Sequence, residues 1–70
     1  MMPLSVLSGG EDAVVKKRGG RPEVKKHLEN LGFVVGTEVS VITEQHGNII
    51  VKVKDTRIAV SKEMANKIFV

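Results

Sequence analysis

The sequence of 70 residues contains no cysteine, no tryptophan and no tyrosine, and it has only two phenylalanines, Phe33 and Phe69. Without cysteine the chain can form neither a disulfide framework nor a cysteine-ligated zinc site. Two aromatic rings are too few for a base-stacking platform that would bind single-stranded nucleic acid. These absences predict a domain that depends on its apolar core, and they disfavour nucleic acid as a partner.

Long apolar segments are also missing. No apolar run approaches the roughly 20 residues of a membrane-spanning helix, and the N-terminus lacks the positive segment and apolar stretch of a signal peptide. We therefore expect a cytoplasmic protein that is not embedded in a membrane. Because the chain is too short for two cores, residues 1–70 are predicted to form one domain. The small core of such a domain leaves self-association into a homo-oligomer open.

Charge is moderate and uneven along the chain. Eleven Lys and Arg residues against eight Asp and Glu residues give a net charge of +3. Six of the cations cluster in the segment 16–26, and they are Lys16, Lys17, Arg18, Arg21, Lys25 and Lys26. Such a cluster fits a solvated face, an acidic protein partner or nucleic acid, and we favour them in that order.

A single helix and several short strands follow from the apolar spacing. Pro22 suits a first helical turn, and Val24, Leu28 and Leu31 recur with helical spacing until Gly32, so residues 22–31 are predicted to form a helix. Residues 3–7 and 13–18 are expected to be extended. Ser61 is predicted to begin a short helical turn near 61–66, and residues 68–70 to form a last strand.

Alternating residues predict a three-stranded meander after Gly36. A three-residue loop, 45–47, with Gly47 at positive φ, would place Val41 opposite Val51 and Val39 opposite Val53. A two-residue turn at 55–56 would then place Val53 opposite Ile58 and Val51 opposite Val60. We expect one core formed by residues from the strands and the helix, namely Leu28, Leu31, Val39, Val41, Val51, Val53, Ile58 and Val60.

Five to six short strands with one inserted helix predict an all-β fold, a small barrel that closes because open edges are a liability. At this point the chain resembles a known family. Residues 28–41, Leu-Glu-Asn-Leu-Gly-Phe-Val-Val-Gly-Thr-Glu-Val-Ser-Val, are similar to the pattern of the FeoA family, ferrous iron transport protein A. Segments 4–7, 58–61 and 65–70 extend the resemblance over nearly the whole chain.

The resemblance implies an SH3-like barrel that serves FeoB, a membrane ferrous iron transporter with a cytosolic GTP-binding part. The expected function is that of a non-enzymatic cytosolic accessory of iron uptake that acts by protein–protein contact. Two alternatives stay open: a detached SH3-like interaction domain of a DtxR-type metal-dependent repressor, and a small basic barrel that binds nucleic acid.

Residues that could carry catalysis are not apparent. The sequence offers no evident nucleophile with a base, and the segment 19–22 lacks the ending of a phosphate-binding loop. Glu23 and His27 share a helix face, but two ligands are too few for a metal, and His46 is interpreted as a polar turn residue. We therefore expect no enzyme activity, no catalytic, cofactor-binding or metal-binding residues, and no cofactor.

Contact with a partner protein is the one role that we assign to individual side chains. Ile42 and Ile50 are predicted to face away from the core and to oppose each other across the first hairpin, with Lys52 beside them and Phe69 as a further apolar contact. Two interpretations of these apolar residues stay open: a docking patch, or a surface that the N-terminal arm or the helix covers. Arg21 and Lys25 on the helix would steer an approaching partner. A small apolar centre with a charged rim is the usual division between affinity and association rate.

Overall fold

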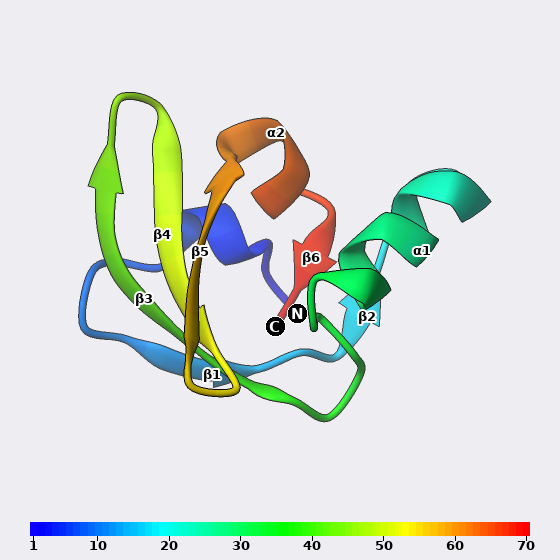
Figure 1. Cartoon of the computed structure of the whole chain (residues 1–70), viewed down its shortest axis with the longest axis horizontal. Coiled ribbons are helices and arrows are strands. Elements are labelled where there is room, and N and C mark those ends of the chain that lie inside the picture. Colours follow the sequence, from blue (N-terminus) through cyan, green and yellow to red (C-terminus); the bar gives the residue numbers. More distant parts are fainter.

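Two antiparallel sheets and two short α-helices make up the structure, a computed structural model that describes residues 1–70 (Figure 1). In chain order the elements are η1 (Leu4–Val6), β1 (Asp12–Val14), β2 (Lys17–Arg18), α1 (Pro22–Asn30), β3 (Glu38–Gln45), β4 (Asn48–Val53), β5 (Thr56–Ser61), α2 (Lys62–Ala65) and β6 (Ile68–Phe69). The larger sheet has the order β1-β3-β4-β5, and β2 pairs with β6. The predicted all-β fold class is thereby confirmed, although the strands form two separate sheets and not one continuous closed ladder. Neither helix has the length and apolar character needed to cross a membrane.

Helix α1 begins at Pro22, as the sequence predicts, and ends at Asn30, one residue before the predicted end. Pro22 occupies the first turn, where its missing N–H costs no hydrogen bond. At the other end Gly32 has φ +108°, its N–H donates to the Glu29 carbonyl at 2.9 Å, and the Phe33 N–H donates to the Leu28 carbonyl at 3.0 Å. This is the double hydrogen bond of a Schellman motif, which turns the chain back toward the helix. The motif directs Phe33 into the core beside the helix.

The first hairpin keeps the predicted register near its base but has a different turn. Val39 pairs with Val53 and Val41 with Val51, as predicted, whereas the turn contains two residues, His46 and Gly47, and not three. Both have positive φ, 51° and 79°, which matches the right-handed twist of the flanking strands. The extra residue forms a β-bulge between Val41 and Thr43, which shifts the pairing by one residue beyond it.

The second hairpin turns one residue earlier than predicted. Lys54 and Asp55 form its turn with φ of 48° and 63°, so Val53 pairs with Thr56 and Val51 with Ile58. The predicted pairs of Val53 with Ile58 and of Val51 with Val60 are therefore wrong by two positions. A shift of two leaves every side chain on its predicted face, because strand side chains alternate with a period of two.

The N-terminal segment and α2 cover one end of the larger sheet. Residues Leu4–Val6 form a 3₁₀ helix in place of the expected extended arm, and Pro3 bridges to Phe69. The Ser5 hydroxyl donates to the Asn66 side-chain carbonyl, which links this segment to the C-terminal end of α2. The Ser61 side chain caps α2 by accepting the Met64 N–H at 3.1 Å, as the sequence predicts.

The core is entirely apolar. Thirteen residues are buried, none of them polar, and they are Leu4, Val15, Leu28, Phe33, Val39, Val41, Ile49, Val51, Val53, Val60, Ala65, Ile68 and Val70. Six of the eight predicted core residues belong to this set, and the other two, Leu31 and Ile58, pack against it half-buried. Because no ionisable side chain is buried, any chemistry of the protein must take place at its surface.

Candidate functional site

The outer face of the larger sheet carries the candidate site. Residues at alternate positions turn away from the core, and the pairing arranges them in two rows across the sheet. The first row contains Thr43, Ile50 and Ala59, and the second contains Asp12, Ser40, Lys52 and Arg57. We call these seven residues the outer face. Ile50 is its only large apolar residue, and it is half-buried between its two small neighbours.

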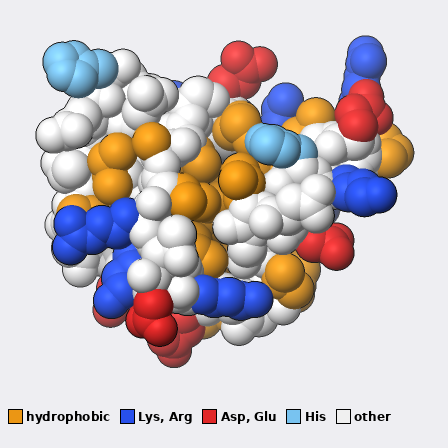
Figure 2. All heavy atoms as spheres, in the orientation of Figure 1, with side chains coloured by type: hydrophobic (Ala, Val, Ile, Leu, Met, Phe, Trp, Pro, Cys, Tyr) orange, Lys and Arg blue, Asp and Glu red, His pale blue; other side chains and the backbone are white.

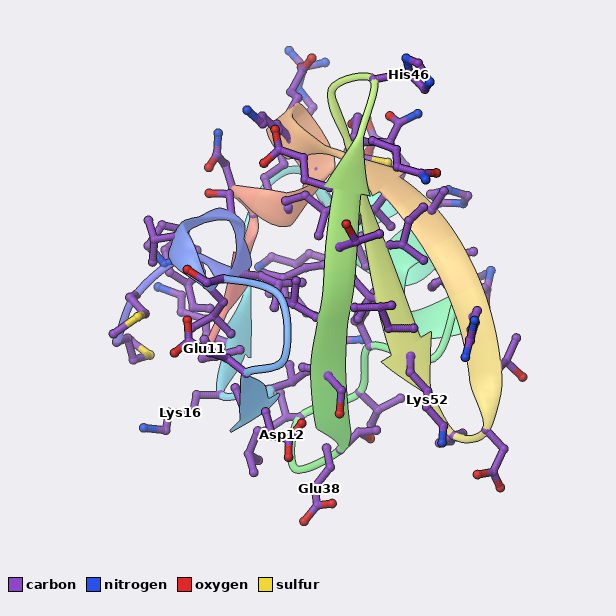
Figure 3. All side chains as sticks on the ribbon, turned by 90° about the vertical axis from the view of Figure 1, so that its left-hand side faces the viewer. Glu11, Asp12, Lys16, Glu38, His46 and Lys52 are labelled. Atoms are coloured by element: carbon purple, nitrogen blue, oxygen red, sulfur yellow. The ribbon has the colours of Figure 1, made fainter.

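Charge is separated along the second row of the outer face. Its basic end consists of Lys52 and Arg57, which are directly paired on β4 and β5, are both exposed and have no acidic partner within 4.0 Å. Its acidic end is Asp12 on β1, and Glu11 and Glu38 lie at the same side of the sheet (Figure 3). Like charges directly opposite each other in a sheet repel. The β5 side of this face therefore favours an acidic group.

Two of the predicted apolar contacts lie outside this arrangement. Ile42 is the bulged residue of β3 and is half-buried, and Thr43 takes its place opposite Ile50, so the expected pair of Ile42 with Ile50 is wrong. Glycine is needed at position 9 because a Cβ there would lie 2.8 Å from the Ile42 carbonyl oxygen. Phe69 belongs to the small sheet, where it is half-buried and its ring lies against Gly19.

The predicted steering residues lie on a different part of the molecule. Arg21 precedes α1 and Lys25 is on its exposed side, and α1 projects on the side of the molecule opposite the β3–β4 hairpin (Figure 1). One cation of the basic cluster is neutralised, because the Arg18 guanidinium forms a salt bridge of 3.0 Å with Glu29. The structure thus brings Ile50 and Lys52 together and leaves Arg21 and Lys25 apart from them.

A groove lies between α1 and α2. Val24 and Met64 form its apolar part, and the other lining residues are Glu23, His27, Ser61, Glu63 and Lys67. Hydrophobic side chains are visible down the middle of the face that contains β5 and α1 (Figure 2). The groove contains the Glu23 and His27 of the sequence analysis, but no three His, Asp or Glu side chains in the chain are close enough together to hold a metal ion.

Five of the seven residues of the outer face were not predicted as site residues, and they are Asp12, Ser40, Thr43, Arg57 and Ala59. The misplaced second turn explains why Arg57 and Ala59 were not predicted, because a turn at 55–56 would have set Lys54 opposite Arg57. With the turn at Lys54 and Asp55, Arg57 pairs with Lys52 and Ala59 pairs with Ile50. The signal available in the sequence was the small residue Ala59 between Ile58 and Val60, two larger apolar residues that the alternation directs inward.

Comparison with known proteins identifies the family. A family model described as the FeoA domain matches residues 2–70. The chain belongs to the FeoA family. A curated relative from Methanocaldococcus jannaschii, named as a candidate Fe(2+) transport protein A, is 33% identical over 70 residues, which is 100% of this chain and 85% of the relative. The resemblance stated from residues 28–41 is thereby confirmed.

Solved FeoA structures share the fold. FeoA of Stenotrophomonas maltophilia, described as a prokaryotic SH3 domain protein and solved with zinc, is 28% identical, covers 99% of this chain and 88% of its own, and has a TM-score of 0.85. FeoA of Chlorobium tepidum is 27% identical with a TM-score of 0.88, and the match covers 97% of this chain and 67% of that one. The fold of this FeoA family member is therefore SH3-like.

A likeness to repressors extends only to the fold. A manganese-dependent transcriptional repressor matches 94% of this chain with a TM-score of 0.85, but at 16% identity and over 38% of its own length. The repressor ScaR, solved with bound Cd²⁺, gives a TM-score of 0.87 at 16% identity. The same SH3-like fold thus occurs as one part of longer repressors.

Proposed function

We propose that this FeoA family protein is a non-enzymatic accessory of ferrous iron uptake that acts on the cytoplasmic side of the membrane, as one domain, by contact with the cytosolic region of a FeoB-type transporter. The observation that carries the proposal is the family match over residues 2–70, which leaves almost none of this chain for another role. The similarity to a relative named as an Fe(2+) transport protein A over the whole of this chain supports it.

The contact is placed on the outer face, with Ile50 at its centre. Ile50 is flanked by Thr43 and Ala59, so a partner side chain can reach it between small neighbours. Lys52 and Arg57 form a charged rim at one side. Of the other expected contact residues, Ile42 borders this face at the bulge. Phe69 belongs to the small sheet, so it would contact the partner only at a second, separate place.

Ile50→Asp should abolish binding of the transporter's cytosolic region while the domain stays folded. A carboxylate at the centre of the contact loses its hydration when the partner binds, and no cation is paired with it there. The measurement is binding of the purified cytosolic region to the immobilised protein, with the melting temperature of each variant measured in parallel. The matched control is Val35→Asp, the same type of change at a residue 56% exposed in the loop between α1 and β3. Normal binding by folded Ile50→Asp, or loss of binding in Val35→Asp alone, would show that the partner does not bind at Ile50.

Lys25→Glu should slow association without changing dissociation. Lys25 and Arg21 lie apart from Ile50, so their charges act over a distance and are screened by salt. The association rate should fall several-fold at low ionic strength and recover toward that of the wild-type protein as salt is raised. An effect of Lys25→Glu that is independent of salt would mean that Lys25 touches the partner directly.

A further inference from the structure

Strand β5 has an open edge. It pairs with β4 on one side, and no strand pairs with it on the other, where Figure 1 shows it at the margin of the larger sheet. The backbone hydrogen bonds outside the helices and strands include none from residues 56–60. An unpaired strand edge is a template for a further strand, and proteins usually cover or shorten it.

The turn determines which backbone groups of this edge are free. In a two-residue hairpin the flanking pair, here Val53 and Thr56, exchanges both hydrogen bonds, and hydrogen-bonded and non-bonded pairs then alternate. Thr56, Ile58 and Val60 therefore point their N–H and C=O groups at β4, and Arg57 and Ala59 point theirs outward. Both are exposed, and no side chain bonds to their backbone groups. Two N–H donors and two C=O acceptors are thus free at strand spacing.

We propose that the β5 edge binds an extended segment of a protein partner as an added antiparallel strand, with an acidic side chain beside Arg57 and an aliphatic side chain beside Ala59. This inference rests on the proposed function, because the segment is assigned to the cytosolic region of the transporter. It adds the mode of contact: backbone groups supply hydrogen bonds, and the adjoining outer face selects the side chains.

Charge decides which occupant fits the edge. Lys52 and Arg57 face each other without an acidic partner within 4.0 Å, and the adjacent turn adds one cation and one anion, Lys54 and Asp55, so an acidic side chain beside Arg57 relieves the repulsion of the pair. A second copy of the same chain would bring another Arg57 and Lys52 to the edge and would increase that repulsion. The opposite edge strand, β1, carries Asp12 and is flanked by Glu11, so it would repel the same segment.

The edge is continuous with the surface proposed for partner contact. Ile50 on β4 pairs with Ala59 on β5. The residue of the added segment that lies beside Ala59 is therefore in line with Ile50, with β5 between them. Neighbouring strands lie about 4.8 Å apart, so the segment would lie about 9.6 Å from β4, and a long side chain of the segment can meet the side chain of Ile50 over the short Ala59. One extended segment therefore contacts the free backbone groups, the cation pair and the apolar centre together.

Amide hydrogen exchange on the wild-type protein tests the proposal directly. In the free protein the amides of Arg57 and Ala59 should exchange quickly, whereas those of Ile58 and Val60 should be protected by β4. Addition of the transporter's cytosolic region should slow exchange at Arg57 and Ala59 by at least about tenfold.

A complex that forms without this protection overturns the edge proposal and leaves the proposed function standing. Absence of any complex overturns both. Protection of the two amides that grows with the concentration of the protein alone identifies a second copy as the occupant and overturns the proposal.

Two substitutions at Ala59 distinguish the contribution of its backbone N–H to binding from that of its side chain. Ala59→Pro removes only an N–H that points to solvent, a place where an edge strand tolerates proline, and it should weaken binding of the cytosolic region about tenfold or more. Ala59→Thr keeps the N–H and changes the side chain, so it should retain most of the affinity. Equal binding by folded Ala59→Pro and Ala59→Thr would overturn the proposal. If Ala59→Pro does not fold, Arg57→Glu serves in its place, and it should weaken binding by an amount that shrinks with salt; unchanged binding would overturn the charge assignment.

Discussion

Phe33→Ala should lower the free energy of unfolding by about 3 to 5 kcal/mol, the range for removing a buried aromatic ring. Phe33 is fully buried and is the largest side chain in that state, although it lies in a loop between α1 and β3. A domain of this length has a total stability of roughly 4 to 10 kcal/mol, so the variant loses a large part of it. Chemical denaturation followed by circular dichroism measures the change.

The neighbouring residue provides the control for Phe33. Val34 is 37% exposed, and Val34→Ala should change the free energy of unfolding by about 0.5 kcal/mol or less. A similar small loss in Phe33→Ala would show that the ring is not a structural part of the core. The slope of the denaturation curve should be the same in both variants if the unfolded state is unaffected.

Leu28→Ala should cost about 2 to 5 kcal/mol, because it removes the residue through which α1 packs on the sheets. Leu28 is fully buried and is the only fully buried residue of this helix. Thermal denaturation should show a lower midpoint, and the exposed Lys26→Ala on the same helix should show almost no change. A Leu28→Ala variant as stable as Lys26→Ala would contradict the packing of α1.

The losses of unfolding free energy in Phe33→Ala and Leu28→Ala should not be additive. The Phe33 N–H bonds to the Leu28 carbonyl at 3.0 Å, and both side chains belong to the same core, so each truncation leaves space next to the other. In the double variant the free-energy loss should differ from the sum of the single losses by at least about 0.5 kcal/mol. A strictly additive pair would mean that helix and loop are stabilised independently.

Much of the fold could be predicted because apolar spacing survives small errors in the turns. The helix, the inward residues of β4 and the cap at Ser61 follow from local pattern alone. The turns could not be predicted in the same way. Placing an extra residue in the loop or in a bulge at Ile42 gives the same pairing of Val41 with Val51, and a turn with Lys54 and Asp55 at positive φ is uncommon for residues other than glycine.

The candidate site depends on those turns, and it was therefore predicted only in part. Ile50 and Lys52 are where the alternation places them, because they share a strand with three buried neighbours. Arg57 and Ala59 become visible only when the register of β5 is known. Ile42 is displaced from its predicted pairing by the bulge in β3. Arg21 and Lys25 lie at and on α1, and their distance from Ile50 follows from the topology, which the spacing of residues along the chain does not specify.

The pairing at the two ends of the described chain has a consequence for folding kinetics. Met2 and Val70 exchange two backbone hydrogen bonds, N–H to C=O, of 3.0 and 2.8 Å, and Pro3 bridges to Phe69. These contacts join residues separated by nearly the whole sequence, and they can form only after the intervening chain has been ordered. Since the folding rate falls as contacts become more distant in sequence, the molecule belongs with small β domains that fold in about milliseconds to seconds, more slowly than helical bundles of equal length.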